Sequence, residues 1–226
     1  VSIHILTPRE EASMASIYLW GSALLMFLLF LAWHENWRGP LKEAEIKMFM
    51  AQMESNENLD KTRFDTWVNF MRCDTGAEFF MVNMLVYTKG KLAHPETGEP
   101  VSAPALFYRY FRSFIGRLLR NGGYPAFSAG AAGDYIEAWN TAANPGWSGS
   151  GIIRYRSRRD LMRAVTDPAF SGGHIYKKAA LAITYALPVE ASSGLLVSPR
   201  IWVGMLLTLL AAFGQIIYLV LRTHNG

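Results

Sequence analysis

The sequence predicts an α+β domain held between two transmembrane helices, and three features support this fold class. An uncharged, apolar segment lies near each end of the chain, at residues 17–33 and 201–221. At about 1.5 Å of rise per residue, each helix would approach the ~30 Å thickness of a bilayer's hydrocarbon core. Between residues 78 and 190, hydrophobic patterns typical of strands and helices follow the order β-α-β-β-α-β.

The chain is therefore expected to have four parts. Residues 1–38 form an N-terminal tail and the first transmembrane helix, and residues 39–77 form an amphipathic helical neck. Residues 78–190 form the α+β domain, and residues 191–226 form a linker, the second transmembrane helix and a short tail. We interpret the first apolar segment as a retained helix rather than a secretory signal peptide, because it lacks a basic n-region and a small-residue cleavage site.

The basic residues that flank the two spans predict an orientation. The outer residues are Arg9 and Arg222, and the inner set is larger, with Arg38, Lys42, Lys47 and Arg200. Because basic residues are retained on the cytoplasmic side, we expect an integral membrane protein with a cytoplasmic central domain and both termini on the opposite side. The single cysteine, Cys73, excludes an intramolecular disulfide and fits a reducing compartment.

The neck contains two amphipathic patterns. Apolar residues follow helical spacing over residues 41–55 (Ile46, Phe49, Met50 and Met53) and again over residues 61–72 (Phe64, Trp67, Val68 and Met71). These helices either lie in the membrane interface or pack on the domain or on a second subunit. Their polar faces mix acidic and basic residues, which favours packing on protein.

The first half of the domain begins with a nearly continuous apolar run, residues 79–87, which predicts a buried strand. The polar residues 89–100 are expected to form a loop. A helix then begins after Ser102, which is placed to cap it with Pro104 in the first turn, and Gly122 marks its end.

The second half supplies two strands, a helix and a last strand. Residues 124–130 and 151–157 form the two strands, and Ser157 with Asp160 resembles a capping box that begins the next helix. A further turn is expected at residues 177–181, followed by the last strand at residues 182–189.

Two βαβ units in this order give a four-stranded antiparallel sheet with both helices on one face, which is the ferredoxin-like arrangement. The other face of the sheet is left uncovered. Because apolar surface on that face needs a partner, we expect a homodimer.

Several segments of the domain resemble one uncharacterised family. These segments are MVNMLVY, Tyr108, RNGGYPAF, Trp147 with IIRYRSRRDLMRAV, TDPAF and KKAALAIT. Their order and spacing over residues 78–190 resemble the family called domain of unknown function thirteen-thirty. That family belongs to the dimeric α/β-barrel superfamily, alongside EthD-like proteins and antibiotic-biosynthesis monooxygenases. The resemblance implies two ferredoxin-like domains that pair their sheets into a barrel with a central cavity.

The chain departs from the family at three points. Family members are usually small and soluble, whereas this chain has two apolar spans. The family often has a proline where this chain has Arg156. It also often has His-Arg before the Ala-Ala-Leu run, where this chain has Tyr176-Lys177, with His174 two residues earlier.

Asn83 and Arg154 are the first candidate ligand-binding residues. Asn83 is an amide inside an apolar strand, so it either binds a ligand carbonyl or is satisfied by the neighbouring backbone. Arg154 lies in the third strand. If the two side chains share a face of the sheet, they would suit an anionic or carbonyl-bearing small molecule; otherwise Arg154 could form an inter-subunit salt bridge.

Four further residues complete the candidate site. Tyr108, Trp147 and Tyr155 either line a ligand cavity or belong to the core. His174 is the candidate for a general base, and the alternative is a packing or surface histidine.

The sequence predicts no metal site, no cofactor and no nucleic-acid partner. No two histidines have the spacing of a metal or haem site, and the net charge of +4 accompanies no nucleic-acid-binding motif. The expected partners are the lipid bilayer, a second copy of the chain and other integral membrane subunits.

The predicted function is that of a membrane-anchored accessory or interaction subunit, or of a small-molecule-binding module. The anchors at both ends and the lack of catalytic motifs favour it. The alternative is a cofactor-independent monooxygenase- or isomerase-like enzyme that acts on a lipophilic small molecule, and this alternative depends on analogy of fold.

Overall fold

The computed structural model describes residues 8–56, 61–167, 172–191 and 198–225, with the side chains of residues 8–12 and 225 left out. Most of the predicted linker, part of TDPAF and the tail histidine His4 therefore lie outside the described residues. The chain divides into two compact units, a pair of terminal helices and the segment Glu35–Ala191.

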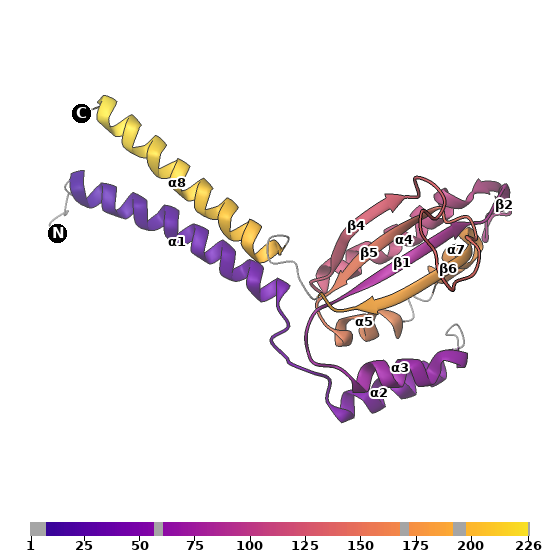
Figure 1. The fold of residues 1–226 in the computed structure, drawn as a ribbon. Helices are drawn as coiled ribbons and strands as arrows, with labels where there is room; N and C mark the ends of the chain where they lie inside the picture. Colours follow the sequence, from indigo (N-terminus) through magenta and orange to yellow (C-terminus); the bar gives the residue numbers. More distant parts are fainter. Residues whose placement is uncertain (1–7, 57–60, 168–171, 192–197, 226) are drawn as a thin grey trace. The chain divides into compact units, whose positions relative to one another are not determined.

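The terminal unit consists of helices α1 (Pro8–His34) and α8 (Pro199–Asn225), which lie side by side (Figure 1). Their segments Ser13–His34 and Pro199–His224 are long and apolar enough to cross a membrane. Two glycines of α8 face large side chains of α1: Gly204 lies against Phe27 and Gly214 lies against Leu19. Small residues at these positions allow the two helices to approach closely.

The second unit is built on a four-stranded antiparallel sheet with the strand order β4-β5-β1-β6. The strands are β1 (Phe79–Tyr87), β4 (Tyr124–Gly130), β5 (Gly149–Tyr155) and β6 (Leu181–Val189). The four predicted strands are confirmed, with the third strand two residues earlier than expected. The α+β class is confirmed as well.

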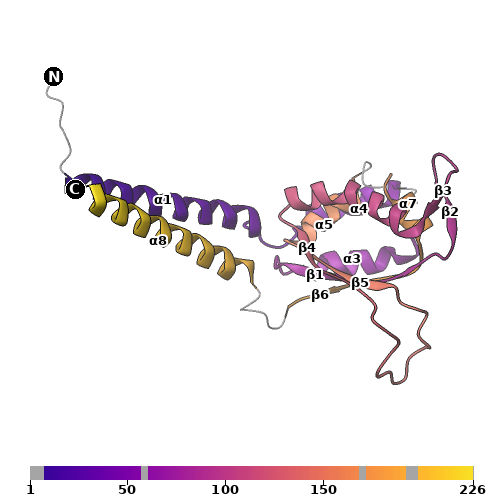
Figure 2. The same cartoon turned by 90° about the horizontal axis from the view of Figure 1, so that it is seen from above.

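Three helices cover one face of this sheet: α4 (Ala103–Arg120), α5 (Arg158–Val165) and α7 (His174–Ala180). Figure 2 shows them on one side, whereas the connection between β4 and β5 extends from the other side. The main core lies between this face and the helices, where Phe79 and Tyr155 of the sheet meet Leu106 and Phe114 of α4. Alternate strand residues therefore point toward the helices or toward the open face.

Several local predictions are corrected. Residues 89–100 contain a small hairpin of β2 (Lys91–Ala93) and β3 (Pro100–Ser102), rather than only a loop. Gly98 allows the chain to turn there because its φ is 73°. Ser102 precedes α4 without a side-chain cap hydrogen bond, whereas Ser157 does accept a hydrogen bond from the Asp160 backbone N–H. Helix α7 begins at His174 and is a full helical segment where only a turn from Lys177 was expected.

The neck folds onto the α+β domain. It contains α2 (Glu43–Ser55), a 3-10 turn η1 (Lys61–Arg63) and α3 (Phe64–Arg72). The predicted apolar stripe is buried in a second core cluster, in which Ile46, Phe49 and Met53 meet Met71 and the domain residue Met162 of α5. The stripe therefore faces protein rather than lipid.

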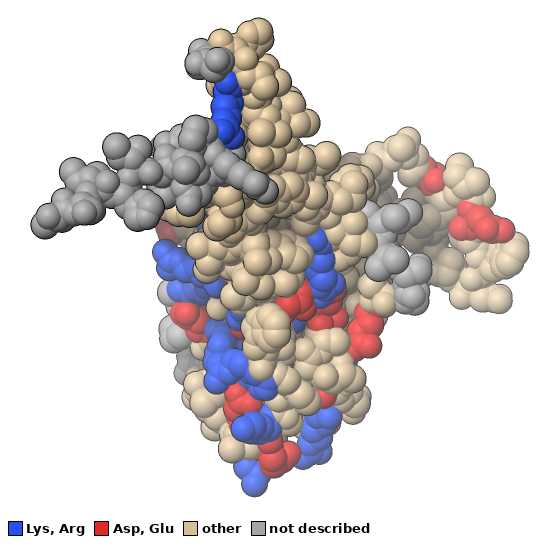
Figure 3. Space-filling model, turned by 90° about the vertical axis from the view of Figure 1, so that its left-hand side faces the viewer, with Lys and Arg blue, Asp and Glu red and all other residues tan. Residues whose placement is uncertain are grey.

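The arginines at and just before the start of α5 are paired with acidic side chains. Arg156 binds Asp160, Arg158 binds Glu190, and Arg159 binds Glu45. The face drawn in Figure 3 also shows Lys and Arg interspersed with Asp and Glu.

Candidate functional site

A pocket of about 520 Å³ lies between the helix-covered face of the sheet and helix α4, with one residue of α7 at its wall. This volume is within the range of small-molecule sites. Its lining residues come from β1 (Asn83, Leu85, Tyr87), from α4 (Pro104, Phe107, Tyr108, Tyr110, Phe111, Phe114), from β4 (Pro125, Phe127, Ser128, Ala129, Gly130), from β5 with its preceding residue (Ser148, Gly149, Ser150, Gly151, Ile153) and from α7 (Lys177).

The pocket exists because large residues face small ones. Helix α4 presents Phe107, Phe111 and Phe114, whereas β4 and β5 present mainly Gly, Ala and Ser opposite them. A Cβ added at Gly151 would meet only the Phe127 carbonyl oxygen, at 4.0 Å, so the space beside this strand is open. Large side chains on these strands would have closed it.

Asn83 lies on the helix-covered face and lines the pocket. Its Nδ2 donates to the carbonyl oxygens of Met81 (3.0 Å) and Gly151 (3.3 Å), so the side-chain oxygen Oδ1 points away from these two carbonyl groups. The amide group is thus satisfied by the neighbouring backbone, as one of the two sequence interpretations expected. Within the described part of the chain, Oδ1 accepts no hydrogen bond and remains able to accept one from a ligand.

Lys177 is the charged residue of the lining. Its Nζ lies 5.5 Å from the ring centroid of Tyr110, within the range of a cation–π contact. Burial lowers the pKa of Lys177 below its usual 10.5, and it raises the pKa of Tyr110 to about 12. Tyr110 therefore keeps its proton at neutral pH, and the ammonium charge is poorly solvated.

Arg154 does not share a face with Asn83. In the register of β1 and β5, Arg154 pairs with Phe80 and Gly151 pairs with Asn83, which places the two side chains on opposite faces. Arg154 is buried in an ion pair with Glu78 and donates to the Gly122 carbonyl oxygen at 2.5 Å. The condition for a joint anion site is therefore not met.

The aromatic candidates separate into three locations. Tyr108 lines the pocket and is largely exposed at its rim. Tyr155 is buried in the core, stacked on Phe79 with a centroid distance of 5.3 Å, and burial raises its pKa. Trp147 packs on Tyr185 and donates from Nε1 to the Tyr135 hydroxyl at 2.8 Å, outside the pocket lining.

His174 begins α7 and packs on Tyr110 with a ring distance of 5.8 Å. It does not line the pocket. Among the described residues, no group of three or more His, Cys, Asp and Glu side chains is placed to hold a metal ion.

Sequence reasoning missed Lys177 and the aromatic wall of α4. Helical spacing alone assigns the α4 phenylalanines to the core. The available signal was the run of small residues in YPAFSAG and GSGI, because a strand without large side chains leaves space beneath a helix.

The chain matches no protein-family model and no curated protein. The resemblance to domain of unknown function thirteen-thirty therefore remains a prediction. Among solved structures, a protein of unknown function from Rhodopseudomonas palustris aligns with 60% of this chain and 96% of its own, with 15% identity and a TM-score of 0.48. The methylated form of that protein aligns with 60% of this chain and 93% of its own, with 16% identity and a TM-score of 0.49. Neither likeness indicates an activity.

Proposed function

We propose that this chain is a membrane-anchored, ferredoxin-like domain that binds a largely apolar small molecule, as a binding or accessory module of a membrane assembly. The observation that supports binding most strongly is the open pocket beneath α4. Its walls are mainly apolar, and Asn83, Lys177 and three serines supply a few polar groups, which is the usual composition of a ligand site. Within the described residues, the lining contains no His, Cys, Asp or Glu.

The strand order and the one-sided helices support the ferredoxin-like assignment. The two apolar helices support anchoring in a bilayer, because their large side chains are mostly exposed in the chain. More basic residues flank the two spans on the side of the domain than on the side of the termini, and this supports a cytoplasmic location of the domain.

Filling the pocket is expected to abolish ligand binding. Gly151→Leu places a branched side chain in the open space beside Asn83, so we expect affinity for a neutral aromatic probe, naphthamide, to fall at least about tenfold. The measurement is calorimetric titration of the full chain in lipid nanodiscs, with empty nanodiscs as the blank.

Gly116→Leu is the matched control. Gly116 is an exposed residue of α4 outside the lining, and a Cβ added there would meet nothing within 4 Å. Affinity should be unchanged in this variant. Absence of probe binding to the wild-type chain, or equal affinities of both variants, would contradict the proposed binding site.

The membrane orientation is testable at the chain's own cysteine. Cys73 is exposed and is the only cysteine in the sequence, so its labelling reports the side on which the domain lies. In intact cells that express the chain, a membrane-impermeant maleimide should label Cys73 only after permeabilisation, while a permeant maleimide labels it in both conditions. Labelling of intact cells by the impermeant reagent would reverse the proposed topology.

A further inference from the structure

We propose that the pocket selects a carboxylate-bearing apolar molecule, and that the Lys177 ammonium is the group that pairs with the carboxylate. This inference rests on the proposed binding function and names the chemical class of its ligand. It concerns a residue that the sequence did not assign to the site.

The first support is the charge of the lining. Lys177 is the charged side chain among the described lining residues, and no acidic side chain accompanies it there. The rest of the wall is aromatic or small. A ligand in this pocket therefore meets one positive charge on an apolar background.

The second support is that Lys177 lacks an ionic partner within the described part of the chain. Two other basic residues of the same helical layer are paired: Arg109 binds Glu96 at 3.2 Å, and Arg117 binds Asp167 at 2.7 Å. Glu96 also accepts a hydrogen bond from the Tyr176 hydroxyl, so this acidic group beside the helix is already engaged. The Lys177 ammonium group instead lies over the ring face of Tyr110.

The third support is energetic. Burial lowers the pKa of Lys177, which means that folding desolvates this ammonium group at a cost in free energy. A carboxylate ligand would offset that cost through a charge-assisted hydrogen bond, whereas a neutral ligand would leave the cation unpaired in a still drier site. An organic cation would be repelled.

The test compares three probes of nearly the same shape: naphthoate, naphthamide and naphthylmethylammonium. With the full chain in nanodiscs, naphthoate is expected to bind at least about tenfold more tightly than naphthamide, and the cation most weakly. Lys177→Met should remove the preference for naphthoate: naphthoate should bind more weakly than to the wild type, and naphthamide at least as tightly, because no unpaired cation is left in the pocket.

Lys178→Met is the matched control, because Lys178 is the exposed neighbour of Lys177 on α7 and does not line the pocket. It should retain the preference. Lys177→Met should unfold at no lower temperature than wild type, since it replaces a poorly solvated cation by an apolar side chain of similar length. Lys177→Gln provides a second neutral variant, which should lose the preference in the same way.

The outcomes separate the two proposals. Equal affinities of naphthoate and naphthamide for the wild-type chain, or a preference that survives both Lys177 variants, would overturn the role of Lys177 while leaving the pocket as a binding site. Probe binding that Gly151→Leu does not weaken, or no binding of any probe, would overturn the binding site itself and this inference with it.

Discussion

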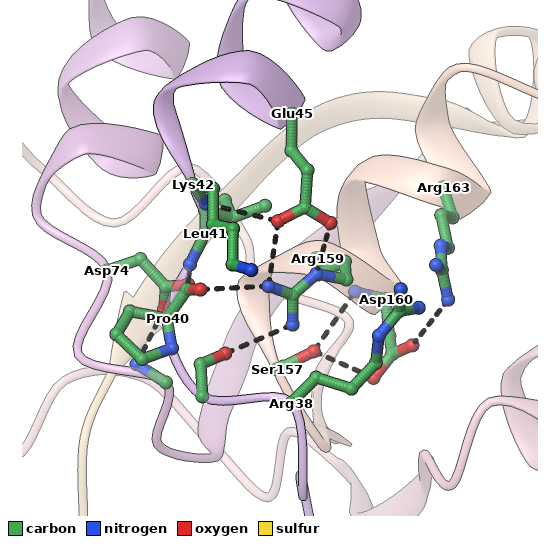
Figure 4. A network of polar contacts seen from close by, with 12 residues as sticks. Arg38, Pro40, Leu41, Lys42, Glu45, Asp74, Ser157, Arg159, Asp160 and Arg163 are labelled. Atoms are coloured by element: carbon green, nitrogen blue, oxygen red, sulfur yellow. Dashed lines mark hydrogen bonds and ion pairs between the residues drawn. The ribbon is translucent and has the colours of Figure 1, made fainter.

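Replacing Arg159 by Met is expected to destabilise the docking of the neck onto the domain by about 3 kcal/mol. Arg159 is only 2% exposed, and its guanidinium joins α5 to the start of α2. It donates to both carboxylate oxygens of Glu45, at 2.8 and 2.9 Å, and to the carbonyl oxygens of Gly39 (3.0 Å) and Pro40 (2.8 Å) (Figure 4). Removing the guanidinium takes one donor from each of these acceptors, although Asn36 Nδ2 still donates to the Gly39 oxygen and the Lys42 backbone N–H still donates to Glu45 Oε2.

The loss should be local to the neck. Hydrogen exchange followed by mass spectrometry is expected to show faster exchange over α2 and α3 in Arg159→Met, with the sheet protected as in the wild type. Arg163→Met is the control, because Arg163 is 42% exposed on its side chain and lies 3.8 Å from Asp160 in a looser ion pair. Its expected cost is below ~1 kcal/mol. Equal protection of α2 in wild type and Arg159→Met would show that the apolar cluster alone holds the neck.

The same ion pair gives the neck a pH dependence. The hydrogen bond from Arg159 is the main cause that lowers the pKa of Glu45 from 4.5 to about 2. Because the folded pKa lies below the ordinary value, the pair contributes its full stability above about pH 4.5 and loses it as the pH falls toward 2. Protection of α2 should decline across this window in the wild type, and Arg159→Met should show a smaller decline.

The strands and the main helix were predictable because their signals are local. The run at residues 79–87 contains nine strand residues without a break, and the apolar face of α4 repeats at helical spacing. The hairpin of β2 and β3 was missed because each of its strands has three residues, which is too short for alternation to be detected.

The site was less predictable, because it depends on contacts between distant residues. Asn83 was identified by its polarity inside an apolar strand. Its separation from Arg154 depends on the pairing register of β1 and β5, which strand patterns do not specify. Lys177 resembles any helical lysine in sequence, and only the packing of α7 near α4 gives it an apolar environment.

The sequence alone did not determine what the neck packs against, because this also depends on contacts between distant residues. The stripe of Ile46, Phe49 and Met53 suits either a membrane interface or a protein surface, and only the mixed charges of the polar faces favoured protein. Two long-range contacts favour docking on the domain. The stripe is buried against Met162, and the Arg159–Glu45 pair joins residues 114 apart in sequence.

The open face of the sheet leads to the last prediction, that Leu187→Arg separates two copies of the chain. On this face β6 exposes Ile183, Tyr185 and Leu187, with Leu187 60% exposed. The connection between β4 and β5 extends from the same side (Figure 2), and its Trp139 is 79% exposed. We propose a second copy as the partner of this surface, because two such sheets can pack face to face.

An arginine at position 187 would carry an unpaired charge into that interface. The dissociation constant of the dimer should therefore rise at least about 100-fold, which corresponds to ~2.7 kcal/mol. Sedimentation equilibrium in density-matched detergent measures this, with Leu119→Arg as the control, since Leu119 is 43% exposed on α4 at the helix-covered side. The fold of Leu187→Arg should persist, because Leu187 is already exposed in the single chain. Two results would contradict the proposed dimer: a wild-type chain that sediments as a monomer, or a Leu187→Arg dimer as stable as the Leu119→Arg dimer. The open face would then have a different partner, to be sought among the other subunits of the membrane assembly.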